Sequence, residues 1–151
     1  MKKVFILLTV LSSLVFATEY KVVFDLMSGD ANKISKNLIT NIALLKEHYK
    51  KQDDTLKVAV VISGDAYKFF VEDIAHSPYA SSPNQDLINH ELEPRFKQLV
   101  NQGTEFKVCA KGMASRGITE VSLYDYAVPA FNKTAALIEY QNAGYAYIPL
   151  N

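Results

Sequence analysis

The stretch Leu56–Ser63 reads LKVAVVIS and is apolar at every position between Lys57 and Ser63. A strand with one face in water alternates polar and apolar residues, whereas a strand covered on both faces is apolar throughout. Gly64-Asp65 follows the run with the composition of a turn. The stretch therefore predicts an inner strand of a parallel sheet that has helices on both sides.

The segment before this strand has the spacing of a helix. Between Asn32 and Gln52, apolar residues recur at steps of three and four, which places them on one helical face. Asp30 or Asn32 can cap the start of this helix. The residues on the expected inner face are Ile34, Leu38, Ile42, Leu45 and Tyr49.

Strands and helices alternate along the rest of the chain. A loop with Pro78 and Pro83 covers residues 75–85, and Pro94 marks a kink or a new start in the helix around it. This alternation predicts an α/β fold, a three-layer α/β/α sandwich with a mainly parallel sheet. The expected strands are 20–26, 56–63, 104–109, one within 121–129, and 145–148; the expected helices are 32–52, 66–74, 86–102, 110–115 and 132–142.

Composition excludes several classes of protein. The 151 residues suit one domain, and 16 basic residues balance 16 acidic ones, so no charge excess points to a nucleic-acid partner. A single cysteine excludes a fold held by internal disulfides. His48, His76 and His90 have no metal-ligand spacing, and no glycine fingerprint of a nucleotide site is present. We therefore expect neither a metal nor a cofactor.

Residues 1–17 have the pattern of a signal peptide. Lys2-Lys3 precedes a short apolar segment, and Val15-Phe16-Ala17 forms a plausible cleavage site. The apolar segment is shorter than the roughly 18–20 residues needed to span a bilayer. We expect cleavage after Ala17, a periplasmic protein formed by residues 18–151, and no membrane contact after cleavage.

Ligands of such sheets bind where the parallel strands end. Ser28-Gly29-Asp30 follows the first expected strand, and it either binds an anion at the helix start or is a loop with a capping Asp30. Ser63-Gly64-Asp65 follows the second strand, as a turn or as part of a pocket wall.

Cys109 ends the third expected strand just before a short helix. Helix N–H groups, together with Lys111 and Arg116, would favour a reactive thiolate there. A buried cysteine that only fills the core fits the same position. A lone cysteine has no second thiol in its own chain, so its chemistry would be a persulfide or a mixed disulfide with a partner.

Residues 103–117, GTEFKVCAKGMASRG, resemble the DsrE/DsrF-like family, whose members share a strand ending in cysteine, a short helix and then Arg-Gly. Residues 141–148, QNAGYAYI, resemble the tail of small exported members, and the likeness extends over residues 18–151. The resemblance implies a Rossmann-like five-stranded sandwich and a homo-oligomer, often a trimer or hexamer. In the sulfurtransferase members, such as TusD-like subunits, the cysteine equivalent to Cys109 carries sulfur as a persulfide. Many relatives have His where this chain has Ser63.

Two hypotheses follow. In the first, a periplasmic protein binds or transfers sulfur through Cys109 and passes it to an acceptor protein. Lys111 and Arg116 would stabilise the anion, and the pocket would be lined by Ser28, Gly29, Ser63 and Gly64. In the second, a non-enzymatic oligomer binds a small ligand or anion, and Cys109 is structural.

Overall fold

The computed structural model describes residues 17–151; the expected signal peptide lies almost wholly outside the described residues. The described chain forms one five-stranded sheet in the order β4-β3-β2-β1-β5, and every neighbouring pair is parallel. This confirms the expected α/β fold. The strands are β1 Glu19–Leu26, β2 Thr55–Ile62, β3 Glu105–Cys109, β4 Ala127–Ala130 and β5 Ala146–Leu150.

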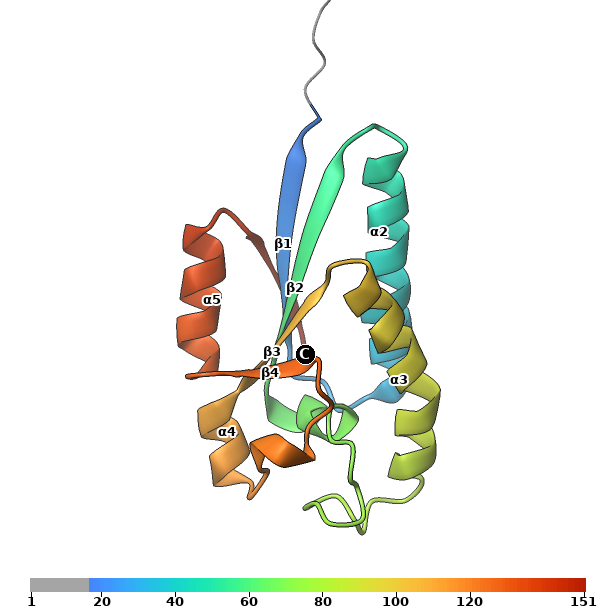
Figure 1. The fold of residues 1–151 in the computed structure, drawn as a ribbon, viewed down its shortest axis with the longest axis vertical. Coiled ribbons are helices and arrows are strands. Elements are labelled where there is room, and N and C mark those ends of the chain that lie inside the picture. The colour runs from blue at the N-terminus through green and yellow to red at the C-terminus, as the bar shows by residue number, and fades with distance from the viewer. Residues whose placement is uncertain (1–16) are drawn as a thin grey trace, which may run out of the picture.

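Helices cover both faces of the sheet (Figure 1). One continuous helical segment follows β1, and α3 follows β2; both lie on the same face, whereas α5 lies on the opposite face. Short helices fill the end of the molecule where the strands finish. The helical elements are α1 Ala31–Lys33, the π-helix η1 Ile34–Thr40, α2 Asn41–Lys50, the 3-10 helix η2 Gly64–Phe69, α3 Gln85–Asn101, α4 Ala110–Ser115, the 3-10 helix η3 Glu120–Ser122 and α5 Lys133–Asn142.

Three expected elements differ in detail. The helix expected over 66–74 is instead the 3-10 helix η2, which ends at Phe69 and continues as irregular chain. The fourth strand occupies only Ala127–Ala130 of the 121–129 range and extends one residue beyond it. Pro94 lies inside an uninterrupted α3, where its ring faces solvent. An exposed position lets water satisfy the carbonyl that proline leaves unpaired, so the helix continues.

The helical segment after β1 contains a π-helix, and Arg95 of α3 bonds to it at both of its ends. The guanidinium of Arg95 donates to the Ser35 carbonyl at 3.2 Å and to the Thr40 hydroxyl at 3.3 Å. The Thr40 hydroxyl in turn donates to the Ser35 carbonyl at 2.9 Å. These contacts satisfy backbone groups at the widened turn.

The two faces of the sheet carry cores of unequal size. The face under α2 and α3 holds most of the buried aliphatic and aromatic side chains, including Phe24, Phe96 and Phe106. The face under α5 has a small core of Val23, Ala59, Val61 and Ala136. Few apolar contacts therefore hold α5, and polar contacts at its ends matter more for its position.

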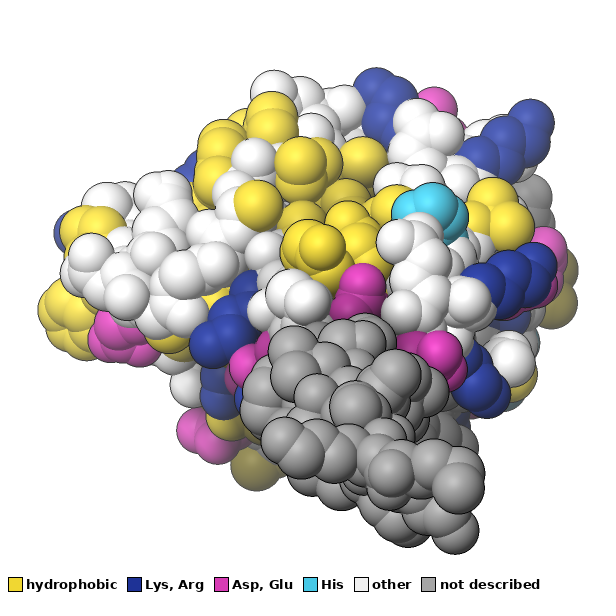
Figure 2. Space-filling model, turned by 90° about the horizontal axis from the view of Figure 1, so that it is seen from above, with side chains coloured by type: hydrophobic (Ala, Val, Ile, Leu, Met, Phe, Trp, Pro, Cys, Tyr) yellow, Lys and Arg dark blue, Asp and Glu magenta, His cyan; other side chains and the backbone are white. Residues whose placement is uncertain are grey.

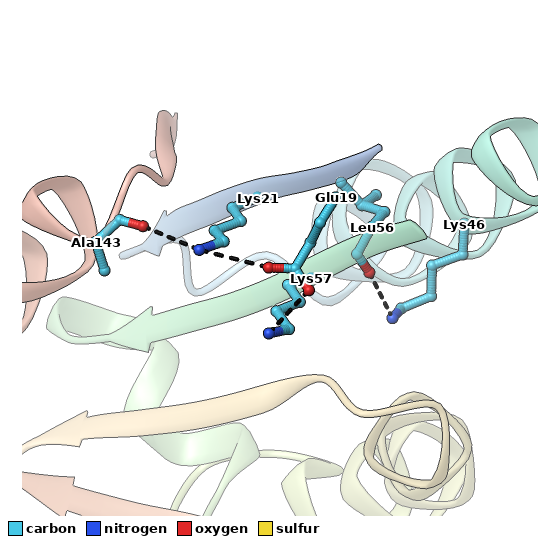
Figure 3. Close-up of polar contacts among 6 residues, drawn as sticks. All are labelled: Glu19, Lys21, Lys46, Leu56, Lys57 and Ala143. Carbon is cyan, nitrogen blue, oxygen red and sulfur yellow. Dashed lines mark hydrogen bonds and ion pairs between the residues drawn. The ribbon is translucent and has the colours of Figure 1, made fainter. Parts of the chain in front are cut away.

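One of those polar contacts lies at the end of the molecule where β1 and β2 begin (Figure 3). The Lys21 ammonium, from β1, donates to the Ala143 carbonyl at the C-terminal end of α5, at 3.3 Å. Glu19 lies between Lys21 and Lys57, at 3.5 Å and 2.9 Å. On the other face, the Lys46 ammonium donates to the Leu56 carbonyl at 3.3 Å. Charged side chains thus connect α5 and α2 to the sheet.

Candidate functional site

The carboxyl ends of β1, β2 and β3 lie next to one another, because these three strands are parallel neighbours in the sheet. Val108 pairs with Ile62 in the parallel register, so the next residues, Cys109 and Ser63, occupy neighbouring positions. The Ser63 backbone N–H donates to the Leu26 carbonyl at 2.9 Å, which places Ser63 beside Met27 at the end of β1. The structure therefore brings together Cys109 and Ser63, two of the predicted site residues.

The Cys109 thiol is almost buried, with the residue 8% exposed. Cys109 has an extended backbone and caps α4, and its sulfur accepts the Gly112 N–H at 3.4 Å. The Tyr67 hydroxyl, from η2, donates to the Cys109 carbonyl at 3.0 Å. The cysteine is thus held between α4 and η2 at both its backbone and its side chain.

The pKa of the Cys109 thiol lies below its ordinary value. Burial alone raises this pKa, but the Gly112 N–H and the Tyr67 hydroxyl, followed by the N–H groups of Lys133 and Lys111, outweigh burial. These donors stabilise the thiolate, which is the nucleophilic form of cysteine. The arrangement can therefore support attack by sulfur.

Lys111 and Arg116 act on the thiol differently from the sequence-based expectation. Lys111 contributes its backbone N–H, and its side chain is exposed. The Arg116 guanidinium lies 5.1 Å from the centre of the Tyr67 ring and donates to the Gly112 carbonyl at 3.5 Å. Arg116 therefore contacts the two residues that bond to Cys109.

Ser28 and Gly29 line a different hollow. It is a shallow cleft of about 450 Å³, and Cys109 is not among its lining residues. The Asp30 carboxylate accepts the N–H groups of Asn32 at 2.8 Å and Lys33 at 3.2 Å. The chain's own carboxylate therefore caps the helix where an anion was the alternative. The cleft is lined by Ser28, Gly29, Asp30, Asp65, Lys68, Tyr79 and Ser82.

Gly64 turns the chain at the end of β2. Its φ is +62°, and an added Cβ would lie 3.0 Å from the Met27 carbonyl oxygen. A side chain there would be strained by both the backbone conformation and the close approach. Gly64 thus shapes the strand ends, which is the turn interpretation of Ser63-Gly64-Asp65.

Sequence reasoning missed a buried polar cluster next to these strand ends. Asp25 is 2% exposed, and its Oδ2 accepts the Lys133 ammonium at 3.2 Å and the Tyr147 hydroxyl at 3.0 Å. The same ammonium lies 2.9 Å from the Met27 sulfur. The available signal was an aspartate within the apolar strand YKVVFDL, because a buried carboxylate needs a partner.

Two buried polar atoms at this end of the sheet have no hydrogen-bond partner among the described residues. They are Oδ1 of Asp25 and the hydroxyl oxygen of Ser63, whose residue is 8% exposed. Buried polar groups are normally satisfied, and exceptions often mark positions where a small ligand or water binds. Ser63 follows Ile62 and Cys109 follows its register partner Val108, so the unpartnered hydroxyl belongs to the residue next to Cys109 across the sheet.

Metal chemistry has no visible basis in residues 17–151, where no group of three His, Cys, Asp or Glu side chains could hold an ion. The His76 imidazole lies 2.8 Å from the Asp73 carboxylate on the surface. His48 bonds to Gln52 on the surface as well. Neither histidine is part of the strand-end site.

Comparison with known proteins adds three findings. A family model described as the DsrE/DsrF-like family matches residues 21–150. An uncharacterized protein of Aquifex aeolicus (strain VF5) is 30% identical over 149 residues, which cover 99% of this chain and 64% of that protein. The chain thus spans less than two thirds of its relative. A protein of unknown function from Methanobacterium thermoautotrophicum shares the fold, with a TM-score of 0.67, 19% identity and coverage of 86% and 98% of the two chains.

Proposed function

Because the chain belongs to the DsrE/DsrF-like family, we propose that it is a sulfur-relay-type protein that carries sulfane sulfur on Cys109. Family membership supports the general role. The assignment to Cys109 rests on one observation, the nearly buried thiol whose pKa neighbouring N–H and hydroxyl groups hold below its ordinary value. The thiolate is the species that attacks sulfane sulfur.

The proposed transfer needs no external oxidant. The Cys109 thiolate attacks the outer sulfur of a donor persulfide, and a new S–S bond forms as the donor's S–S bond breaks. The electron pair leaves on the donor's thiolate, so a persulfide and a thiolate are exchanged. A thiolate on an acceptor protein then attacks the outer sulfur on Cys109 in the same way and restores the starting thiolate. A single cysteine is sufficient for this cycle.

Two groups near Cys109 support a persulfide on this residue. The Gly112 N–H at 3.4 Å would stabilise negative charge on the thiolate. The unpartnered Ser63 hydroxyl lies at the neighbouring strand position and can donate to a persulfide anion. Ser63 would thus take over hydrogen bonding at the position where relatives carry His.

A binding protein with a structural cysteine is the second candidate. The 8% exposure of Cys109 favours it, because a buried thiol is normally an inert packing residue. The 450 Å³ cleft beside Ser28 and Gly29, which excludes Cys109, would then hold the ligand. Reactivity of the thiol separates the two candidates.

We further propose a periplasmic location and a homo-oligomeric state. The location is supported by the basic and apolar pattern of residues 1–17.

The oligomer is supported by hydrophobic side chains that gather on the end of the molecule where β1 begins (Figure 2). An apolar groove of about 290 Å³ lies between α2 and strands β1 and β5, and its wall includes Tyr20, Tyr49 and Ile148. Residues 17–151 contain no helix long and apolar enough to cross a bilayer.

The test of sulfur carriage is intact mass spectrometry of the purified protein after exposure to a low-molecular-weight persulfide. We expect the mass to rise by one sulfur atom, and the gain to disappear when an acceptor thiol is added. Cys109→Ser should show no gain and keep the fold, because serine is nearly the same size. An unchanged mass for the unaltered protein would exclude sulfur carriage and favour the binding protein.

A further inference from the structure

Each end of helix α5 is joined to strand β1 by a contact of a lysine side chain. At the C-terminal end, the Lys21 ammonium of β1 donates to the Ala143 carbonyl at 3.3 Å (Figure 3). At the N-terminal end, the Lys133 ammonium of α5 binds the Asp25 carboxylate of β1 at 3.2 Å. The small apolar core beneath α5 leaves these two contacts as its main polar attachments to β1.

The N-terminal contact runs against two local preferences. Lys133 is the first residue of α5, where the helix dipole disfavours positive charge. Asp25 lies near the end of β1 and is 2% exposed, and an ionised carboxylate buried in this way is costly without a partner. Each residue offsets the cost of the other. Violations of local rules that are compensated in this way often occur at functional sites.

This contact fixes the part of α5 that faces the thiol. Cys109 pairs with Ala130 in the register of β3 and β4, and α5 begins three residues later, at Lys133. The Lys133 backbone N–H is one of the groups that stabilise the thiolate form of Cys109. Lys133 thus lies at the helix start next to Cys109, and its side chain binds Asp25.

We propose that Asp25 is a positioning residue for Cys109: by holding the Lys133 side chain, it keeps the Lys133 N–H, at the start of α5, near the sulfur. Tyr147, from β5, supports this role because its hydroxyl donates to the same Asp25 oxygen at 3.0 Å. The inference deepens the proposed sulfur carriage, since a fixed donor keeps the thiol in its nucleophilic form before sulfur arrives.

A through-space effect of charge is the competing explanation, and it makes a prediction of opposite sign. Asp25→Asn removes a negative charge from the neighbourhood of the thiol, which by Coulomb's law alone lowers the thiol pKa. If Asp25 acts by positioning, the same substitution releases the start of α5 and raises the thiol pKa. Lys133→Met raises the thiol pKa under both explanations, so Asp25→Asn is the deciding variant.

The experiment measures the alkylation rate of the full-length protein by iodoacetamide over a range of pH, with no sulfur donor present. The other titratable or charged groups that face Cys109 are Tyr67 from η2, and Lys111 and Arg116 from α4; all are left unchanged. The midpoint of the rate against pH reports the thiol pKa. We expect Asp25→Asn and Lys133→Met to raise this midpoint by about half a pH unit to one pH unit, which is a roughly three- to tenfold loss of thiolate at low pH. Lys21→Met, which cuts the attachment at the other end of α5, should leave the midpoint unchanged.

Tyr147→Phe provides a second variant in case Asp25→Asn does not fold. It changes no charge and removes one of the hydrogen bonds to Asp25, so we expect a smaller rise in the midpoint. A fall in the midpoint for Asp25→Asn, or no change in both Asp25→Asn and Tyr147→Phe, overturns the positioning role. Because this readout involves no sulfur donor, failure of persulfide loading leaves it interpretable.

Discussion

Gly112 determines how closely α4 approaches η2, and therefore where the Cys109 sulfur lies. A Cβ added at Gly112 would overlap the Tyr67 hydroxyl and lie 3.0 Å from the ring carbon that carries it. That hydroxyl bonds to the Cys109 carbonyl, and the Gly112 N–H bonds to the Cys109 sulfur. The missing side chain thus allows two groups to reach one cysteine.

We expect Gly112→Ala to destabilise the protein by about 1–3 kcal/mol through overpacking. A glycine-to-alanine substitution inside a helix ordinarily stabilises a protein by about 1 kcal/mol. A loss of stability in Gly112→Ala would therefore indicate the overlap with Tyr67. Urea unfolding measures the change. The double variant with Tyr67→Phe removes the hydroxyl and should recover part of the loss. Additive effects of the two substitutions would show that the overlap is relieved elsewhere.

The thiol of Cys109 also makes stability depend on pH. Its folded pKa is lowered, so the thiolate contributes stability that is present above the unfolded pKa and lost as pH falls through the folded pKa. We therefore expect the free energy of unfolding of the unaltered protein, relative to Cys109→Ser, to be larger at about pH 9 than at about pH 6. Buried tyrosines such as Tyr126, whose pKa is raised by burial, act in the opposite direction only at higher pH. An equal difference at both pH values would contradict a lowered thiol pKa.

At the residue scale, the sequence predicted where a residue lies along its strand better than it predicted contacts between residues far apart in the chain. Cys109 and Ser63 were placed at strand ends because a strand's end is visible in its local pattern. Asp25, Lys133 and Tyr147 were missed because they are far apart in the chain, and only the sheet order brings β1, β5 and α5 together. Tyr67 was missed because a 3-10 helix presents it, which apolar periodicity does not indicate.

Among the helical elements, the π-helix η1 is bonded by a side chain from another helix. Arg95 donates to the Ser35 carbonyl and to two hydroxyl groups, those of Ser35 and Thr40. The sequence predicted the helix over 32–52 from its apolar spacing, and the inner-face residues Ile34, Leu38 and Ile42 are buried. It did not indicate the wider turn, because apolar spacing carries no information on the bonds that Arg95 of α3 makes to it.

We expect Arg95→Ala to cost about 1–3 kcal/mol, because it leaves partly buried acceptors without a charged donor. Amide hydrogen exchange should increase over Ile34–Thr40 and stay unchanged in α5. Lys97→Ala is the matched control on the same helix. It removes an ion pair with Glu93 whose lysine is exposed, and such pairs contribute about 1 kcal/mol or less. Equal losses in the two variants would argue against a specific role for Arg95 at the π-helix.

For the whole molecule, the exposed apolar surface predicts self-association. Tyr20 is 41% exposed and Ile148 is 42% exposed, and both line the groove between α2 and the β1–β5 edge. We expect light scattering to detect a trimer or hexamer, and Ile148→Glu to shift it toward monomer. Leu87→Glu, at an isolated exposed leucine of α3, should have no such effect. A monomer at micromolar concentration for the unaltered protein would refute the oligomer.

The whole fold was more predictable than the site because the fold depends on patterns that repeat in every element. Apolar runs and helical spacing recur along the chain and predicted a parallel α/β sandwich, which the sheet confirms. These patterns carry no information on which strand, besides β2, pairs with β1. That place is taken by β5, which brings Tyr147 to Asp25.

The pairing of β1 with β5 limits when, during synthesis, the surroundings of Cys109 can form. Asp25 and Cys109 are synthesised before Lys133 and Tyr147, because β5 follows the other four strands along the chain. β1 can pair with β5 only after residues 146–150 have been translated. Until then the carboxylate of Asp25 lacks both of its partners, and the cysteine lacks the start of α5. We therefore expect the Cys109 thiol of a nascent chain to be less ionised until Lys133 and Tyr147 have been added.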